Sequence, residues 1–276
     1  MPRPFRQVDV FTVIPYIGNP LAVVHDADGL SDQQMQRFAR WTNLSETTFL
    51  LTPGEEEADY RVRIFTPAAE LPFAGHPTLG SCHAWLEAGG QSRQPGVVVQ
   101  ECGAGLVTIR VREDGSAFAA PPLVRSGPVE GPVAERVAAM LGIGRDDIVD
   151  MQWADNGPGW IAVLLSSADA VLQVRPGPGD LDVGIAGPHP PDGPADFEVR
   201  AFFPVDGVTR EDPVTGSFNA SLAQWMLGAG LAQAPYVVRQ GTALGRSGQV
   251  RITQDADGQV WVGGSAVTCV AGTVEL

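Results

Sequence analysis

Two short segments decide the fold of this chain: Glu70-Leu71-Pro72-Phe73-Ala74-Gly75-His76 and Glu211-Asp212-Pro213-Val214-Thr215-Gly216-Ser217. Both follow the pattern Glu-x-Pro-x-[Ala/Thr]-Gly-x, and they lie about half a chain length apart. Each comes after a stretch of alternating apolar residues typical of a strand, and each precedes a stretch with the apolar spacing of a helix that carries a tryptophan. A similarity this short in the same strand–turn–helix setting predicts a duplicated domain.

The glycine of each segment, Gly75 or Gly216, stands immediately before the expected helix. A glycine lets a ligand approach the backbone closely, and the first N–H groups of a helix have no partner within it. The helix dipole adds positive potential at that end, so such a helix start can hold a carboxylate without a lysine. The alternative is that each glycine only makes a turn and caps its helix.

The remaining pattern alternates short strands and helices. Ser31 followed by Gln34 is a capping box, which predicts a helix to about Trp41. Apolar spacing predicts helices over 77–88, 135–141 and after Ser217, and strands over 7–13, 48–51, 60–65, 97–100, 106–112, 160–166, 197–203, 250–252 and 260–263. The Pro/Gly-rich passage 121–132 is the best linker candidate, so we expect two domains, 1–120 and 121–276.

The charge and the basic residues exclude several classes of function. The net charge of −14 argues against a nucleic-acid partner bound through a broad basic face. All 18 basic residues are arginine, which excludes a lysine Schiff base and a Walker-type phosphate loop. The four histidines form no ligand pattern and no nucleotide fingerprint is present, so we expect neither a metal nor a cofactor.

The apolar and cysteine patterns bear on location. No stretch approaches the roughly 20 apolar residues of a membrane span, and the N-terminus runs directly into a strand pattern without a secretion segment. Three cysteines at unrelated spacings indicate no disulfide framework or zinc site. These features predict a cytoplasmic protein without a membrane partner.

Glu46 is the acidic residue with the most informative surroundings. It lies in the polar run Asn43-Leu44-Ser45-Glu46-Thr47, directly before an apolar strand, so its carboxylate could enter a cleft from the strand edge. A solvated surface group or a helix cap is the alternative, and spacing by itself leaves both open.

Several blocks of this sequence together resemble those of the phenazine-biosynthesis (PhzF-like) isomerase family. They occur in the family's order from about residue 8 to the C-terminus, at positions 18–24, 43–47, 65–67, 70–80, 211–217, 240–241, 245–246 and 263–267. The resemblance implies an α+β, diaminopimelate-epimerase-like fold, in which two similar domains each wrap a curled sheet or barrel around a central helix. In such a fold the last strand can cross back to the first domain. The resemblance also implies a homodimer.

The resemblance also implies a function and a set of site residues. We expect a cofactor-independent isomerase that moves a proton on a small carboxylate-bearing substrate; the family's named reaction is isomerisation of trans-2,3-dihydro-3-hydroxyanthranilate. Carried over residue by residue, Glu46 is the general acid/base, with His76 and Asp212 as its polar partners. The expected substrate contacts are Asn19, Ser45, Gly75, Gly216 and Ser217.

Two alternatives remain at this point. An amino-acid racemase or epimerase on the same fold uses a cysteine at each helix start, where this chain has His76 and Ser217, and Cys82 is expected in the core. A protein that binds a small molecule without turning it over is the other alternative. His83, seven residues after His76, is expected to be a buried or capped histidine rather than a metal ligand.

Overall fold

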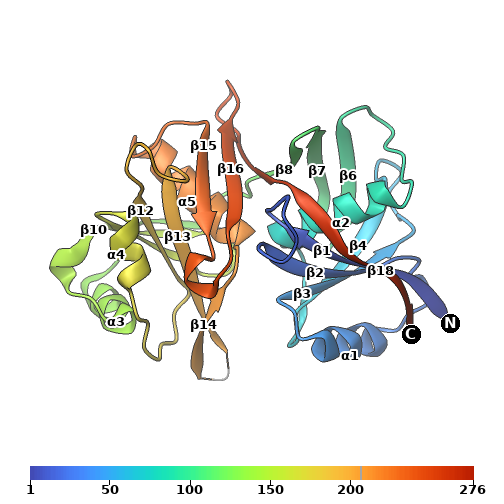
Figure 1. The fold of residues 1–276 in the computed structure, drawn as a ribbon, viewed down its shortest axis with the longest axis horizontal. Helices are drawn as coiled ribbons and strands as arrows, with labels where there is room; N and C mark the ends of the chain where they lie inside the picture. Colours follow the sequence, from blue (N-terminus) through green and yellow to red (C-terminus); the bar gives the residue numbers. More distant parts are fainter. Residues whose placement is uncertain (206) are drawn as a thin grey trace. The chain divides into compact units, whose positions relative to one another are not determined.

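The computed structural model describes residues 1–205 and 207–276, which form two compact units (Figure 1). Unit 1 consists of Met1–Ala119 and Gly263–Leu276, and unit 2 consists of Ala120–Val262. Each unit is a sheet associated with one long buried helix, so the predicted fold class, two similar α+β halves around central helices, is confirmed.

Unit 1 is built around helix α2. Its strands pair in the order β18–β1–β2–β3–β4–β6–β7–β8, with β5 beside β4; the β2–β3 and β4–β6 pairs are parallel. The elements are β1 (Pro2–Val10), β2 (Asn19–Val24), α1 (Asp32–Thr42), β3 (Glu46–Leu51), β4 (Tyr60–Phe65), β5 (Glu70–Leu71), α2 (Gly75–Glu87), β6 (Val97–Cys102), β7 (Gly105–Arg112), β8 (Gly115–Ala119) and β18 (Ala266–Glu275). Helix α2 contacts β1, β2, β3, β6, β8 and β18, which explains why most of its residues are buried.

Unit 2 repeats this plan around helix α5. Its strands pair in the order β9–β10–β11–β12–β13–β15–β16, with β14 beside β13; the β11–β12 and β13–β15 pairs are parallel. The elements are β9 (Arg125–Pro128), α3 (Gly131–Leu141), β10 (Ile148–Asp155), β11 (Ile161–Leu165), α4 (Ala168–Gln173), β12 (Val183–Pro188), β13 (Phe197–Val205), β14 (Val208–Asp212), α5 (Gly216–Gly228), β15 (Tyr236–Gln240) and β16 (Gly248–Gln254), with short 3-10 turns at Arg145–Asp147 and Thr242–Leu244. Strand β17 (Val260–Gly264) begins in unit 2 and ends in the first residues of the second segment of unit 1.

The two repeats exchange their last strands. After β8 of the first repeat the chain forms β9, which pairs with β10 of unit 2. After β17 of the second repeat it forms β18, which pairs with β1 of unit 1 over the whole length of that strand. Each sheet therefore contains one strand contributed by the other repeat.

Local signals predicted most elements and misplaced some boundaries. The Ser31–Gln34 capping box is present at the start of α1, as predicted. The first strand, predicted over 7–13, is instead β1 (Pro2–Val10), because pairing with β18 extends it toward the N-terminus. The linker predicted over 121–132 contains β9, and the helix predicted from 135 begins at Gly131, with a proline in its first turn.

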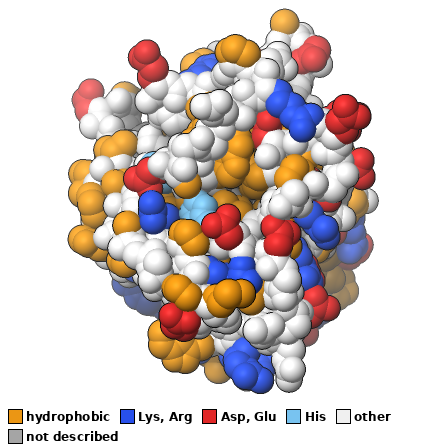
Figure 2. Space-filling view, turned by 90° about the vertical axis from the view of Figure 1, so that its right-hand side faces the viewer, with side chains coloured by type: hydrophobic (Ala, Val, Ile, Leu, Met, Phe, Trp, Pro, Cys, Tyr) orange, Lys and Arg blue, Asp and Glu red, His pale blue; other side chains and the backbone are white. Residues whose placement is uncertain are grey.

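The surface drawn in Figure 2 mixes acidic, basic and apolar side chains, without one continuous basic area. No helix in the described part of the chain has the length and apolar character that a bilayer crossing requires.

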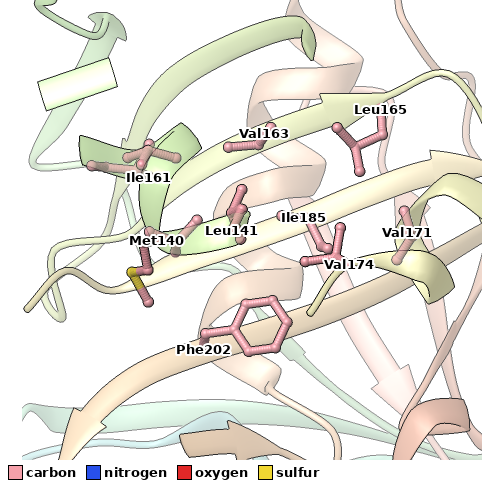
Figure 3. Close-up of a cluster of buried hydrophobic side chains, with 11 residues drawn as sticks. Met140, Leu141, Ile161, Val163, Leu165, Val171, Val174, Ile185 and Phe202 are labelled. Carbon is pink, nitrogen blue, oxygen red and sulfur yellow. The ribbon is translucent and has the colours of Figure 1, made fainter. Parts of the chain in front are cut away.

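A buried apolar layer covers the face of the unit 2 sheet that carries α3 and α4 (Figure 3). Val163 and Ile185 of the parallel pair β11–β12 belong to the same buried cluster as Leu141 of α3 and Val174, which follows α4. Burying one such side chain contributes about 1.5–3 kcal/mol relative to leaving it exposed. Unit 1 has a corresponding layer between α1 and its sheet, formed by Val24, Ala27, Met35, Phe38, Ala39, Phe49 and Phe65.

Candidate functional site

Glu46, His76 and Asn19 meet at one edge of the unit 1 sheet. Glu46 and Asn19 are the first residues of β3 and β2, which are parallel neighbours, so both strands start at the same edge. Helix α2 also starts there. His76 Nδ1 lies 2.8 Å from Glu46 Oε2, and His76 Nε2 lies 3.0 Å from the backbone oxygen of Asn19. The side chain of His76 is 4% exposed and that of Glu46 is 17% exposed, so the carboxylate is the part of the pair that solvent reaches.

The contact with Asn19 fixes the position of one of the protons of this pair. A carbonyl oxygen only accepts hydrogen bonds, so His76 Nε2 carries a proton and donates it to Asn19. Nδ1 then has two possible states. It accepts from a protonated Glu46, or it is protonated itself and donates to the Glu46 carboxylate. In both states one proton is shared along the Glu46–His76 contact, and either group can hold it. This arrangement suits a carboxyl group that gives and takes a proton.

Two further expected contacts lie beside this pair. Ser45 directly precedes Glu46 and is half-buried. Gly75 is the first residue of α2, whose start receives no side-chain cap. A Cβ at position 75 would overlap the ring of Phe118, so packing in the core explains why a glycine is needed there. The expected role of Gly75 in substrate binding concerns its backbone N–H.

Asp212, expected to act with Glu46, belongs to unit 2, where it ends β14. Its Oδ2 accepts a hydrogen bond from Thr215 Oγ1 at 2.7 Å. Gln240 Nε2 donates to the backbone oxygen of Asp212 at 3.2 Å, and Gln240 Oε1 accepts from Thr215 N and from Asn219 Nδ2. Gln240 therefore joins β15 to the turn that precedes α5, and it holds Asp212 and the helix start in one fixed arrangement.

Gly216 and Ser217 form the start of α5 in unit 2. Ser217 Oγ accepts a hydrogen bond from Trp160 Nε1 at 3.1 Å, and its backbone oxygen accepts from Asn156 Nδ2 at 2.9 Å. These contacts fix the position of the Ser217 hydroxyl, which stays half-buried.

The repeat gives Glu46 a counterpart in unit 2, Asp182. Strand pairing connects the residue after Glu46, across β4, to Glu70 of β5. In the same way it connects the residue after Asp182, across β13, to Glu211 of β14. Because Glu70 and Glu211 match in the repeated segments, Glu46 and Asp182 occupy equivalent positions, one in each unit.

No local sequence signal singles out Asp182. Burial, followed by the nearby Asp155 carboxylate, raises the pKa of Asp182 to about 6. The constant spacing between the two repeated segments would have pointed to Gly187 instead, because the loops of the two halves differ in length. Only the strand register identifies the equivalence.

The cysteines and the other α2 histidine lie in ordinary packing environments. Cys82 is fully buried, as predicted, and burial raises the pKa of its thiol to about 12. His83 Nε2 lies 3.1 Å from Thr268 Oγ1, and burial lowers the pKa of His83. Within residues 1–205 and 207–276, no three His, Cys, Asp or Glu side chains come together in a way that could hold a metal ion.

Comparison with known proteins identifies the family. A family model described as "Phenazine biosynthesis-like protein" (PhzC-PhzF) matches residues 8–272. The chain belongs to this family. It is 36% identical to "Antisense-enhancing sequence 1" of Schizosaccharomyces pombe, over 97% of each chain. It is 35% identical to the trans-2,3-dihydro-3-hydroxyanthranilate isomerase of Pseudomonas fluorescens, over 98% of each chain.

Solved structures show the same fold. A PhzF-family phenazine biosynthesis protein of Bacillus anthracis superimposes over 100% of both chains with a TM-score of 0.83 at 24% identity. A hydroxyproline epimerase of Agrobacterium vitis shares the fold more distantly, with a TM-score of 0.59 at 15% identity over 99% of this chain and 92% of that one. Several relatives that match nearly the whole chain are named isomerases, and the chain is an isomerase of this family.

Proposed function

We propose that this PhzF-like protein is a cofactor-independent isomerase that moves a proton between two carbons of a small carboxylate-bearing substrate, with Glu46 as the general acid/base. The observation that carries the proposal is the chain of contacts from Glu46 through His76 to the Asn19 carbonyl. It gives Glu46 a buried partner that stores or returns a proton.

The proposed reaction needs one carboxyl group. His76 occupies Oε2 of Glu46, which leaves Oε1 for the substrate. The Glu46 carboxylate removes a proton from one carbon, and the electron pair of that C–H bond delocalises into the unsaturated substrate. The resulting carboxylic acid returns the proton to a second carbon and becomes a carboxylate again, so the enzyme ends with its original number of protons.

The proposal extends to the other expected contacts and to the substrate. Asp212 is proposed as a further polar residue of the site, and the backbone at the starts of α2 and α5, with Ser217, as the anchor for the substrate carboxylate. Asn19 and Ser45 are proposed to line the site. The candidate substrate is trans-2,3-dihydro-3-hydroxyanthranilate, because relatives that match nearly the whole chain are named for its isomerisation.

The racemase alternative is less well supported by the residues present. That mechanism needs a thiol at each helix start, and His76 and Ser217 occupy these positions. Cys82 and Cys102 are buried, and burial raises the pKa of each thiol, which makes both poor bases.

Turnover of trans-2,3-dihydro-3-hydroxyanthranilate in D₂O tests the proposal with the wild type, Glu46→Gln and the exposed control Glu57→Gln. Loss of an acid/base group lowers kcat by about two orders of magnitude or more. We therefore expect this loss for Glu46→Gln and wild-type rates for Glu57→Gln. The wild-type product should contain deuterium to the extent that the proton on Glu46 exchanges with solvent before it returns to the substrate. Equal rates for Glu46→Gln and the wild type would show that Glu46 is not the acid/base. An inactive wild type would show that the substrate is wrong.

A further inference from the structure

Asp9 is a buried carboxylate outside the Glu46–His76 pair that the proposed reaction does not use. It is 2% exposed and lies next to the last residue of β1. Its Oδ2 accepts a hydrogen bond from the backbone N–H of Gly18 at 2.8 Å. Its Oδ1 is also buried and receives no hydrogen bond from the described residues. A buried carboxylate with so few partners costs stability, so its presence needs a structural explanation.

The bond from Gly18 to Asp9 connects directly to the proton-transfer pair. Asn19 follows Gly18, and its backbone oxygen accepts the hydrogen bond from His76 Nε2 at 3.0 Å. Gly18 itself is tightly enclosed, because a Cβ there would overlap the backbone oxygen of Val10 and approach Asp9 Oδ1. Asp9 therefore holds the peptide that joins residues 17 and 18, and Gly18, the residue directly before Asn19, has little room to move.

Pro20 fixes the other side of Asn19. A residue that precedes proline is restricted to extended backbone conformations, because its N–H and Cβ would clash with the proline ring in the helical region. Pro20 also lies directly opposite Asp9 in the β1–β2 pair. The Asn19 carbonyl is thus oriented from both directions, by Pro20 after it and by the Asp9–Gly18 bond before it.

Unit 2 contains the same kind of contact. Asp155 ends β10, the counterpart of β1, and its Oδ1 accepts from the N–H groups of Gly157 and Gly159, both at 2.7 Å. An aspartate that holds the glycine-containing turn after the first strand is therefore common to both repeats. In unit 1 that turn leads into the residue that contacts His76.

We propose that Asp9 is a positioning residue for proton transfer: by holding Gly18 it orients the Asn19 carbonyl, which keeps the proton of His76 on Nε2 and directs Nδ1 toward Glu46. This inference rests on the roles proposed for Glu46 and His76. Without the contact to Asn19, a neutral His76 is free to carry its proton on Nδ1. Nδ1 then cannot accept a hydrogen bond from a protonated Glu46, which the proposed proton transfer requires.

Two measurements on Asp9→Ala, Asp9→Asn and Asp59→Ala test the proposal. The first is the tautomer of His76 from its imidazole ¹⁵N shifts. The second is kcat and KM on trans-2,3-dihydro-3-hydroxyanthranilate across pH. Asp59 is the control, because it is another aspartate of unit 1 that accepts hydrogen bonds from backbone N–H groups, and its donors, Arg93 and Val99, are not neighbours of Asn19 in the sequence.

We expect His76 to be protonated on Nε2 in the wild type and in Asp9→Asn, whose side-chain oxygen still accepts from Gly18. Asp9→Ala should give a mixture of tautomers, a kcat lower by about tenfold to a hundredfold as expected for misplaced groups, an altered pH profile and a KM close to the wild-type value. Asp59→Ala should change none of these four readouts.

The proposal is overturned if Asp9→Ala keeps the wild-type tautomer, or if its kcat and pH profile follow those of Asp59→Ala. If Asp9→Ala does not fold, Asp9→Ser gives the same comparison, because its hydroxyl is too short to make the bond to Gly18. The tautomer measurement needs no substrate, so it decides the role of Asp9 even if the proposed substrate is wrong.

Discussion

The repeat places the same ion pair in both units, once near the surface and once in the interior. In unit 1, Arg63 Nε and Nη2 donate to the two carboxylate oxygens of Glu70 at 2.7 and 2.6 Å. In unit 2, Arg200 Nε and Nη2 donate to those of Glu211 at 3.0 and 2.7 Å. The glutamates are the first residues of the two repeated segments. Because chemistry and geometry match, the pairs differ mainly in burial.

Burial predicts very different effects for the two Glu→Gln substitutions. The side chains of Arg200 and Glu211 are 5% and 11% exposed, whereas those of Arg63 and Glu70 are 18% and 42% exposed. Removing one partner of a buried pair costs about 3–5 kcal/mol, because the other charge remains buried without compensation. An exposed pair is worth about 0–1 kcal/mol, and Arg63 also keeps Asp32 as a partner. We therefore expect Glu211→Gln to lower the free energy of unfolding several times more than Glu70→Gln does.

Urea unfolding followed by circular dichroism measures both effects from the shift of the midpoint at unchanged slope. Repeating it at 1 M salt is a control, since screening reduces the effect of the exposed pair far more than that of the buried one. Replacing both members of the buried pair, as Arg200→Met with Glu211→Leu, should recover much of the stability lost in Glu211→Gln. Equal losses for the two single variants, or a Glu211→Gln loss that disappears in salt, would refute this reasoning.

Two further predictions concern Asp182 and Gly75. The pKa of Asp182 is raised from 3.8 to about 6, so the folded state binds the extra proton and this residue lowers stability as pH rises through that window. Asp182→Asn should therefore stabilise the protein above pH 6 by roughly 1–2 kcal/mol, after partial exposure is discounted, and by nothing below about pH 4. Melting curves across pH check this, and a pH-independent difference would contradict it. Gly75→Ala should cost about 1–3 kcal/mol by overpacking against Phe118. The control Gly131→Ala, also at a helix start but with no atom within 4 Å of the added Cβ, should be neutral or stabilising. Equal effects of the two alanines in thermal unfolding would show that Phe118 does not decide the need for glycine.

Features encoded locally could be read from the sequence. The capping box at Ser31, the alternation of 60–65 and the paired glycine segments each depend on a few neighbouring residues, and the elements they predict are present. The order of the motifs along the chain was also sufficient to predict the family and its fold. The start of β1 was misplaced, and β9 was missed within the predicted linker, because pairing with strands far away in the chain forms or extends these strands.

The sequence by itself determined a duplicated α+β fold of the PhzF type and Glu46 as the acidic residue to consider first. The tertiary structure decided which groups form hydrogen bonds with Glu46 and with its partner His76. His76 lies 30 positions away in the sequence, and its second partner is a backbone oxygen, which no side-chain pattern reveals. Strand register alone identifies Asp182 as the counterpart of Glu46, and burial alone separates the two Arg–Glu pairs. These properties arise from contacts between distant segments, so they exist only once the strands have paired and the helices have packed against them.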